Sequence, residues 1–330
     1  MRQPRLLLVL FGLAWAPFAL AGSPHDQLKR MNDAFVNLSY DGVFSFFSGD
    51  ELASLRVVHK VVDGVRRERL VHLNGAPREI VRHGEKVACI VQPGDDLIAI
   101  EKSIPSGPFA RAFVREFDRI SDTYVLDESG EGRVAGRVAR RIAVNPKDQY
   151  RYGYRLWLDK ETSLLLRSEL VDAEGTKLEI FMFNELLLGD DVAPEALEPQ
   201  QAEGSMVSHL TLQAADTQLP LDVTEANPPA GQWRTRWLPP GFTMASDDWR
   251  PKPESGHHVS SLMYSDGLAA FSIFIEPMPS EGAARMVSQS GATVAMTHAV
   301  ESADDFYLVT LVGEIPLKTA RAIIETVYLK

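Results

Sequence analysis

The chain has 330 residues, of which 45% are hydrophobic and 24% charged, and its formal net charge is −11. This composition is typical of a globular protein, and the acidic balance argues against a nucleic-acid partner, because nucleic acids are bound by basic surfaces. The only cysteine, Cys89, excludes an intramolecular disulfide and lies in a segment that predicts a buried strand, where the thiol is expected to be inert.

The first 21 residues have the form of a secretory signal peptide. Arg2 and Arg5 precede a short apolar run, Leu6–Trp15, and an Ala-Leu-Ala sequence then offers a cleavage site between Ala21 and Gly22. The apolar run is shorter than the roughly 20 residues that span a bilayer, so a retained membrane anchor is the weaker alternative. We therefore expect a mature protein that works outside the cytoplasm, after export through a cleavable signal peptide.

The next part of the chain predicts one helix followed by an antiparallel sheet. Ser23 and Pro24 are a favoured helix start, and apolar residues then repeat with helical spacing over residues 24–38. From Tyr40 the period changes to two, and turn signals such as Asp63-Gly64 and Asn74-Gly75 separate short segments. The expected strands are 40–47, 56–62, 65–73, 78–83, 86–92, 95–100, 122–127, 133–144, 153–159, 164–172 and 177–186, with a helix or ordered loop at 106–117 and a flexible hairpin at Gly130–Gly132.

A second domain is expected after a polar stretch punctuated by proline and glycine. Residues 199–231 predict a linker, although Leu210–Leu212 could still pair with a sheet edge. Beyond it, two hairpins and a last helix predict a smaller antiparallel domain. The hairpins are expected at 259–264 with 268–276 and at 292–300 with 305–312, and the helix at 316–328. The expected division is a signal peptide 1–21, a large domain 22–198, a linker 199–231 and a second domain 232–330, in an α+β fold.

The sequence contains no recognisable catalytic or metal site. The glycines at 130, 132 and 136 match a dinucleotide fingerprint only loosely. The adjacent His257 and His258 would point to opposite faces of a strand, which is poor geometry for a metal. We expect no catalytic residue, no metal and no cofactor, and therefore not an enzyme. Two arginine groups are interpreted as solvated sheet faces, with an anion-binding face as the alternative: Arg66, Arg67, Arg69, Arg78 and Arg82, and Arg133, Arg137, Arg140 and Arg141.

Several strands of the large domain are apolar on both faces. Strands of this kind need cover on both sides, and two interpretations remain open: core packing beneath helices, or a curved sheet whose concave face holds a hydrophobic ligand. We expect Phe44 and Phe46 to share the concave face. The candidate lipid-binding residues are Phe44, Phe46, Phe47, Trp157, Phe181 and Phe183.

A second group of aromatic residues begins the smaller domain. Aromatic side chains are frequent at binding hot spots, so this group is a candidate for contact with a protein partner. The alternative is that Trp237 and Phe242 close the domain core. The candidate partner-binding residues are Trp233, Trp237, Phe242, Tyr264 and Phe271.

Several segments resemble the RseB/MucB family. The sequence Trp237-Leu-Pro-Pro-Gly-Phe242 is similar to the motif that opens its C-terminal domain, and Tyr264–Glu276 is similar to its central hairpin. The sequence Val312-Gly-Glu-Ile-Pro316 resembles the join to its last helix. The segment Tyr40-Asp-Gly-Val-Phe44 with Gly49 resembles its first strand.

The resemblance implies a periplasmic negative regulator of a sigma-E-type (AlgU-type) envelope stress response. Such a protein binds the periplasmic part of a membrane-spanning anti-sigma factor and shields it from regulated proteolysis. The implied large domain is an unclosed β-barrel with helices in its opening, similar to LolA-type lipoprotein carriers. The implied signal for release is lipid A, lipopolysaccharide or lipoprotein acyl chains, and a homo-oligomer is left open. The alternative is a periplasmic lipid or lipoprotein carrier without a regulatory role, which would not need the second domain.

Overall fold

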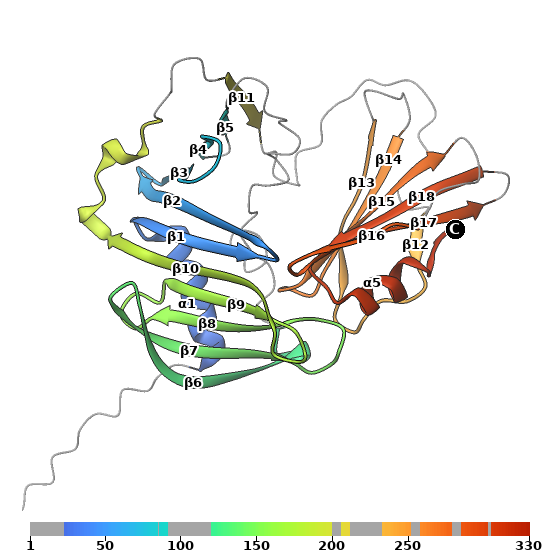
Figure 1. Cartoon of the computed structure of the whole chain (residues 1–330), viewed down its shortest axis with the longest axis horizontal. Helices are drawn as coiled ribbons and strands as arrows, with labels where there is room; N and C mark the ends of the chain where they lie inside the picture. Colours follow the sequence, from blue (N-terminus) through green and yellow to red (C-terminus); the bar gives the residue numbers. More distant parts are fainter. Residues whose placement is uncertain are drawn as a thin grey trace, which may run out of the picture.

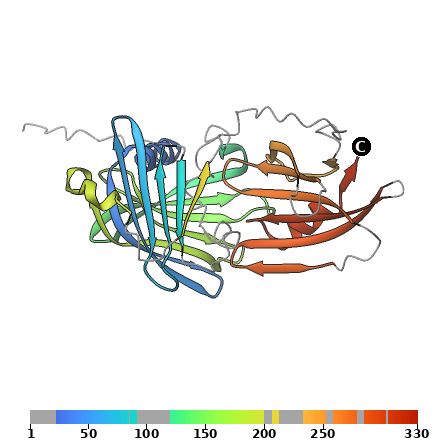
Figure 2. The same ribbon diagram turned by 90° about the horizontal axis from the view of Figure 1, so that it is seen from above.

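The computed structural model contains two large antiparallel sheets that lie side by side along the long axis of the molecule (Figure 1), and a third sheet of two short strands. Seen from above, the two sheets still occupy separate halves and meet along one boundary (Figure 2). The expected signal peptide, the segments 95–100 and 106–117, and most of the expected linker lie outside the described residues. The structure describes residues 23–84, 86–91, 120–199, 206–211, 233–251, 258–278, 285–302 and 305–330.

The large sheet has eleven strands in the order β11-β5-β4-β3-β2-β1-β10-β9-β8-β7-β6. Neighbouring strands are antiparallel throughout, and the edge strands β11 and β6 do not pair, so the barrel is open as the family resemblance implies. Pairing of β11 with β5 brings Leu210 against Val87, which confirms the expected pairing with a sheet edge. The strands are β1 Tyr40–Ser48, β2 Glu51–Val62, β3 Val65–His72, β4 Glu79–His83, β5 Lys86–Val91, β6 Tyr124–Val134, β7 Arg137–Pro146, β8 Gly153–Asp159, β9 Leu165–Val171, β10 Lys177–Leu188 and β11 Met206–Thr211.

The helix α1, Pro24–Asn37, lies against one face of this sheet (Figure 1). Its start is a capping box: the Ser23 hydroxyl accepts the backbone N–H of Asp26 at 3.2 Å, and the Asp26 carboxylate accepts the backbone N–H of Ser23 at 3.2 Å. Leu28 and Met31 are fully buried in a core that includes residues of β1, β2, β6, β8 and β10. One helix can share a core with strands so far apart in the sheet only because the sheet curves around it.

Two turn predictions in this domain differ from the structure. Gly130 and Gly132 lie inside β6, where a bulge interrupts the pairing with β7, and the hairpin of these two strands turns later, at Ala135 and Gly136. A Cβ atom at Gly132 would lie 3.0 Å from the indole Nε1 of Trp157, so the glycine makes room for that ring. The connection from β3 to β4 is longer than the Asn74-Gly75 hairpin that the sequence predicts, and the Asn74 side chain within it accepts a hydrogen bond from the Ser54 backbone N–H at 2.8 Å.

The outer face of the large sheet is partly covered by the segment after β10. This segment contains two short 3-10 helices, η2 Gly189–Asp191 and η3 Pro194–Leu197. Val192 and Leu197 pack on Val58 of β2. In addition, Arg69 pairs with Glu79 and donates to the Ala196 carbonyl at 3.0 Å. Arg69 is therefore buried, and the solvated arginine face expected from the sequence is wrong at this position.

The small sheet has six strands in the order β13-β14-β15-β18-β17-β16, and the helix α5, Leu317–Ile324, packs on one face. The expected helix 316–328 is wrong at its end. It stops at Ile324 because β19, Val327–Leu329, pairs with β12, Trp233–Thr235, and buries Val327. The six strands are β13 Thr243–Pro251, β14 His258–Ser265, β15 Ala270–Met278, β16 Val287–Ser290, β17 Thr293–Ser302 and β18 Asp305–Gly313.

Candidate functional site

An aromatic cluster lies at the centre of the large sheet, on the face that α1 covers. Phe44 of β1 pairs in register with Phe183 of β10, and Phe46 pairs with Phe181. The ring centroid of Phe44 is 4.9 Å from that of Phe181 and 5.9 Å from that of Phe183. Phe44, Phe181 and Phe183 are buried in one core with α1, whereas Phe46 is only partly buried beside it. The four side chains share a face, and Phe46 is the one that a ligand can reach most directly.

A glycine shapes this cluster. The register between β1 and β10 shifts next to Val43. A Cβ atom at Gly42 would lie 2.6 Å from Cε1 of Phe183 and 2.8 Å from the carbonyl oxygen of Glu185. Gly42 therefore allows the Phe183 ring to lie directly against the backbone of β1.

The other two candidate lipid-binding residues lie on the opposite face of the sheet. Phe47 alternates with Phe46 along β1, and Trp157 alternates with the core residues Leu156 and Leu158 along β8. The Arg167 guanidinium lies over the Trp157 ring, 4.7 Å from its centroid. The structure therefore does not bring Phe47 to the aromatic cluster under α1, whereas Trp157, although it alternates with the core residues of β8, still packs against the same core.

Most of the candidate partner-binding residues lie in the core of the second domain. Trp233, Phe242, Tyr264 and Phe271 are buried between the small sheet and α5. Tyr264 stacks on Phe271 with ring centroids 5.2 Å apart. These four side chains shape the domain from within and are not available at its surface in this arrangement.

Trp237 is the exception. It is only partly buried, and its ring meets Tyr150 of the large domain edge to face, with centroids 5.3 Å apart. This contact puts Trp237 at the junction between the two domains.

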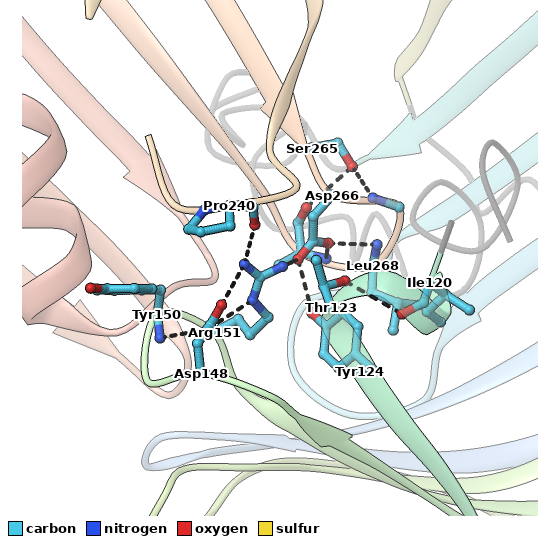
Figure 3. Close-up of polar contacts among 12 residues, drawn as sticks. Ile120, Thr123, Tyr124, Asp148, Tyr150, Arg151, Pro240, Ser265, Asp266 and Leu268 are labelled. Carbon is cyan, nitrogen blue, oxygen red and sulfur yellow. Dashed lines mark hydrogen bonds and ion pairs between the residues drawn. The ribbon is translucent and has the colours of Figure 1, made fainter. Parts of the chain in front are cut away.

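The junction contains a buried ionic network that sequence reasoning missed (Figure 3). Arg151, in the loop between β7 and β8, pairs with Asp266 in the turn between β14 and β15, and both side chains are fully buried. The Tyr124 hydroxyl donates to Asp266 at 3.1 Å. Arg151 also donates to Asp148 at 3.0 Å and to the Pro240 carbonyl at 2.5 Å. The buried polar groups of each domain thus find part of their ion-pair and hydrogen-bond partners in the other domain.

The turn that carries Asp266 is itself held in place by this carboxylate. The backbone N–H groups of Leu268 and Ala269 donate to Asp266 at 2.9 and 2.7 Å. Burial raises the pKa of Asp266, and the charge of Arg151 and these N–H donors act against that shift. In the sequence Asp266 is part of a Ser-Asp-Gly turn signal, which gives no sign of a partner in the other domain.

A second contact joins two turns. Gly49, between β1 and β2, and Gly291, between β16 and β17, have positive φ angles of 60° and 55°. A Cβ atom at Gly291 would overlap the Ser48 hydroxyl and lie 2.9 Å from the backbone nitrogen of Gly49. Leu268 and Ala292 of the second domain belong to the core cluster of the large sheet. The two domains are therefore packed against each other and not merely tethered.

The described residues contain no group of three or more His, Cys, Asp or Glu side chains arranged to hold a metal ion. In the same part of the chain, no helix has the length and apolar character needed to cross a bilayer. Cys89 is buried in β5. The candidate surfaces are therefore the aromatic face of the large sheet, the second domain and the junction between them.

Both halves of the chain match known proteins. A sequence model of the MucB/RseB N-terminal domain matches residues 23–201, and one of the MucB/RseB C-terminal domain matches residues 227–328. The sigma factor AlgU regulatory protein MucB of Pseudomonas aeruginosa is 36% identical over 326 residues, which cover 98% of this chain and 96% of that protein. The sigma-E factor regulatory protein RseB of Escherichia coli K12 is 28% identical over 301 residues, which cover 91% and 89%.

A solved structure extends the likeness to three dimensions. The complex structure of Pseudomonas aeruginosa MucA/MucB matches with a TM-score of 0.75 and 32% identity, over 94% of this chain and 99% of that chain. Both sheets and the junction between them fall within this coverage. The chain thus belongs to the MucB/RseB family.

Proposed function

We propose that this protein is a periplasmic regulator that binds the periplasmic part of a membrane-spanning anti-sigma factor and shields it from regulated proteolysis. The observation that carries this proposal is the match of both domains to a sigma factor regulatory protein that has been solved in complex with MucA. A protein that only carries lipid would need the large sheet alone. In this chain the second domain is packed against the large sheet through a buried ion pair, which favours a regulator built from both domains.

The proposal assigns a separate role to each domain. Residues 22–198 form the lipid-sensing domain, residues 199–231 the linker and residues 232–330 the domain that binds the anti-sigma factor, after removal of the signal peptide 1–21. Of the proposed partner-binding residues, Trp237 is the one that a partner can contact directly, since it is only partly buried. Trp233, Phe242, Tyr264 and Phe271 would act by maintaining the shape of the domain.

Lipid A, lipopolysaccharide or lipoprotein acyl chains are the proposed signal. The aromatic face beneath α1 supports this, because Phe44, Phe46, Phe181 and Phe183 form a continuous apolar cluster next to that helix. Phe47 lies on the other face and would not contact the same ligand, whereas Trp157 packs against the core of the aromatic face and would support it from that side. Burial of an acyl chain contributes about 0.8 kcal/mol per CH₂ group, so a chain of ordinary length could replace the contacts that α1 makes.

A titration of a lipid A probe, with and without a saturating anti-sigma periplasmic fragment, tests the regulator against the carrier. A ligand releases a partner only through its different affinity for two states of the protein. Because such coupling is reciprocal, the fragment should weaken lipid binding by the same factor, about 5–150-fold for a coupling of the usual size. Equal lipid affinity in both titrations would contradict the proposed release and favour the carrier.

A further inference from the structure

A row of side chains crosses four neighbouring strands of the large sheet. Arg141 of β7 lies opposite Trp157 of β8, and Trp157 lies opposite Arg167 of β9. Arg167 lies opposite Met182 of β10, and its Nη1 is 3.9 Å from the Met182 sulfur. Residues directly opposite each other in an antiparallel pair point to the same face, so these four side chains lie side by side. Met182 in turn lies opposite Ser45 of β1, which puts the row on the face away from Phe44 and Phe46.

The row has an apolar end. Ile180 lies two positions before Met182 on β10 and therefore on the same face. It pairs in register with Phe47 of β1, and Phe47 pairs with Leu52 of β2. Leu52 is 64% exposed, and the other side chains of the row and of its apolar end are half-buried. We call the row together with this end the outer strip.

Glycines of β6 leave room beside Arg141 and Trp157. A Cβ atom at Gly132 would lie 3.0 Å from the Trp157 Nε1, and one at Gly130 would lie 3.3 Å from Nη2 of Arg141. Gly130 lies in the bulge of β6 and has a φ angle of 92°, which residues with a side chain rarely adopt. The guanidinium and the indole therefore lie directly against the backbone of β6, at the kind of bulge that often re-aims a side chain next to a binding site.

The Arg141 guanidinium lacks an acidic partner within the described part of the chain. Its Nε is buried without a hydrogen-bond acceptor. Nearby cations are engaged: Arg137 binds Asp159, and Arg167 binds Glu169. A buried donor without an acceptor is costly, so an oxyanion that reaches Arg141 would gain from completing its hydrogen bonds.

The acidic side chains around the strip cannot readily serve as that partner. Glu169 is buried and binds both Arg167 and Lys177. Asp159 is buried and binds Arg137, and Asp127 accepts a hydrogen bond from Asn145 at 3.2 Å. The strip therefore offers one unneutralised guanidinium beside aromatic and aliphatic side chains, and its complement is a carboxylate that has apolar groups next to it.

We propose that the outer strip is a docking surface for an acidic segment of a protein partner, in which one carboxylate binds Arg141 and apolar side chains lie over Trp157 and Met182. The planar guanidinium donates two parallel hydrogen bonds to a carboxylate. Aromatic, methionine and arginine side chains are also the ones enriched in protein interfaces. Because Trp157 and Met182 are half-buried in the sheet, they suit a segment that lies on them better than a bilayer, which apolar side chains must enter.

This surface differs from the surfaces of the proposed function. The contact with the anti-sigma factor is assigned to the second domain, and the lipid to the face beneath α1. The docking of an acidic segment on the outer strip therefore stands or falls independently of both.

Nuclear magnetic resonance of the mature protein tests the proposal through the Trp157 indole N–H, which is assigned with Trp157→Phe. The probe is a synthetic 12-residue peptide of repeated Glu-Leu-Thr triplets, and its control has Gln in place of every Glu. The acidic peptide should shift the Trp157 signal until it saturates. The control peptide should bind at least about tenfold more weakly, the equivalent of one hydrogen bond to a charged group.

The variants locate the carboxylate on the strip. Arg141→Gln should weaken the acidic peptide by at least about tenfold and remove its preference over the control peptide, whereas Arg141→Lys, which keeps the charge, should recover part of the affinity. Arg133→Gln is the matched control, since Arg133 is exposed and alternates with Gly132, so that it points to the other face of β6. It should behave like the wild type.

A second pair of variants avoids the half-buried positions. Leu52→Glu adds a negative charge at the exposed end of the strip and should weaken the acidic peptide by up to about fivefold at low salt. Val138→Glu, at a 49% exposed position on the other face of β7, should leave the affinity unchanged.

Three results would overturn the proposal. The acidic peptide could fail to shift the Trp157 signal, or Arg141→Gln could bind it as tightly as Arg133→Gln does. Alternatively, phosphatidylglycerol vesicles could shift the signal when the peptide does not, which would assign the strip to a membrane surface.

Discussion

Arg151 and Asp266 lie 115 positions apart in the chain, and their fully buried side chains form an ion pair between the two domains. The Arg151 guanidinium also lies over the rings of Tyr124, in the large domain, and Phe242, in the small one, at 5.6 and 5.1 Å from their centroids. A charge so enclosed has no access to water. Each member of the pair therefore depends on the other to remain charged at the junction.

The first prediction concerns this pair. Asp266→Asn keeps the shape of the side chain but leaves Arg151 as a buried charge without its partner, so we expect a loss of about 3–5 kcal/mol in the free energy of unfolding. Denaturant titration of the mature protein measures this loss. Lys160→Met, which removes the surface ion pair with Glu131, is the control and should leave the stability nearly unchanged. A loss below about 1 kcal/mol in Asp266→Asn would show that the buried pair contributes little.

The second prediction concerns the aromatic face. Phe46→Ser should weaken binding of a fluorescent acyl-chain probe, because Phe46 is the partly covered member of the cluster beneath α1. The loss of apolar contact area corresponds to about 1–2 kcal/mol, or roughly a tenfold weaker affinity. Phe47→Ser changes the next residue on the same strand but on the opposite face, so the probe should bind it as it binds the wild type. Equal weakening in both variants would argue against a ligand on the α1 side of the sheet.

The third prediction concerns the two turns that meet at the junction. Gly291→Ala adds a Cβ atom that collides with Ser48, whereas Gly136→Ala adds one at a positive φ of 77° with open space around it. Both variants carry backbone strain on the order of 1 kcal/mol, but only the first forces the domains apart. Hydrogen exchange should therefore show faster exchange at Ala292 in Gly291→Ala alone. If Gly136→Ala has the same effect, the contact between the turns does not hold the junction.

The fourth prediction concerns the protein partner. Trp237→Ala should weaken binding of an anti-sigma periplasmic fragment by about 2 kcal/mol or more, the usual threshold for a hot-spot residue. Phe274→Ala is the comparison, since this side chain is 38% exposed on the face of the small sheet that lies away from α5. Calorimetric titration of both variants decides between the two surfaces. A larger loss in Phe274→Ala would move the proposed contact to the open face of the sheet.

The sequence by itself determined the elements whose cause is local. The capping box at Ser23 and Asp26, the change of period at Tyr40, and the Asp63-Gly64 turn, whose two residues both have positive φ angles, depend on neighbours within a few positions. For the same reason the strand that contains Cys89 and the antiparallel sheet could be predicted. The open form of the barrel was implied by the family resemblance. Strict alternation along β1 also gave the shared face of Phe44 and Phe46.

Tertiary structure decided which faces meet and where elements end. Alternation shows that Phe46 and Phe47 point in opposite directions, but only the packing of α1 shows which of them faces the core. The last helix stops at Ile324 because its continuation pairs with β12, a strand about 90 positions earlier in the chain. Asp266 has the local pattern of a turn residue, and its partner Arg151 lies in the other domain. A buried charge is recognised by what surrounds it, and those surroundings exist only once both domains are folded and packed together.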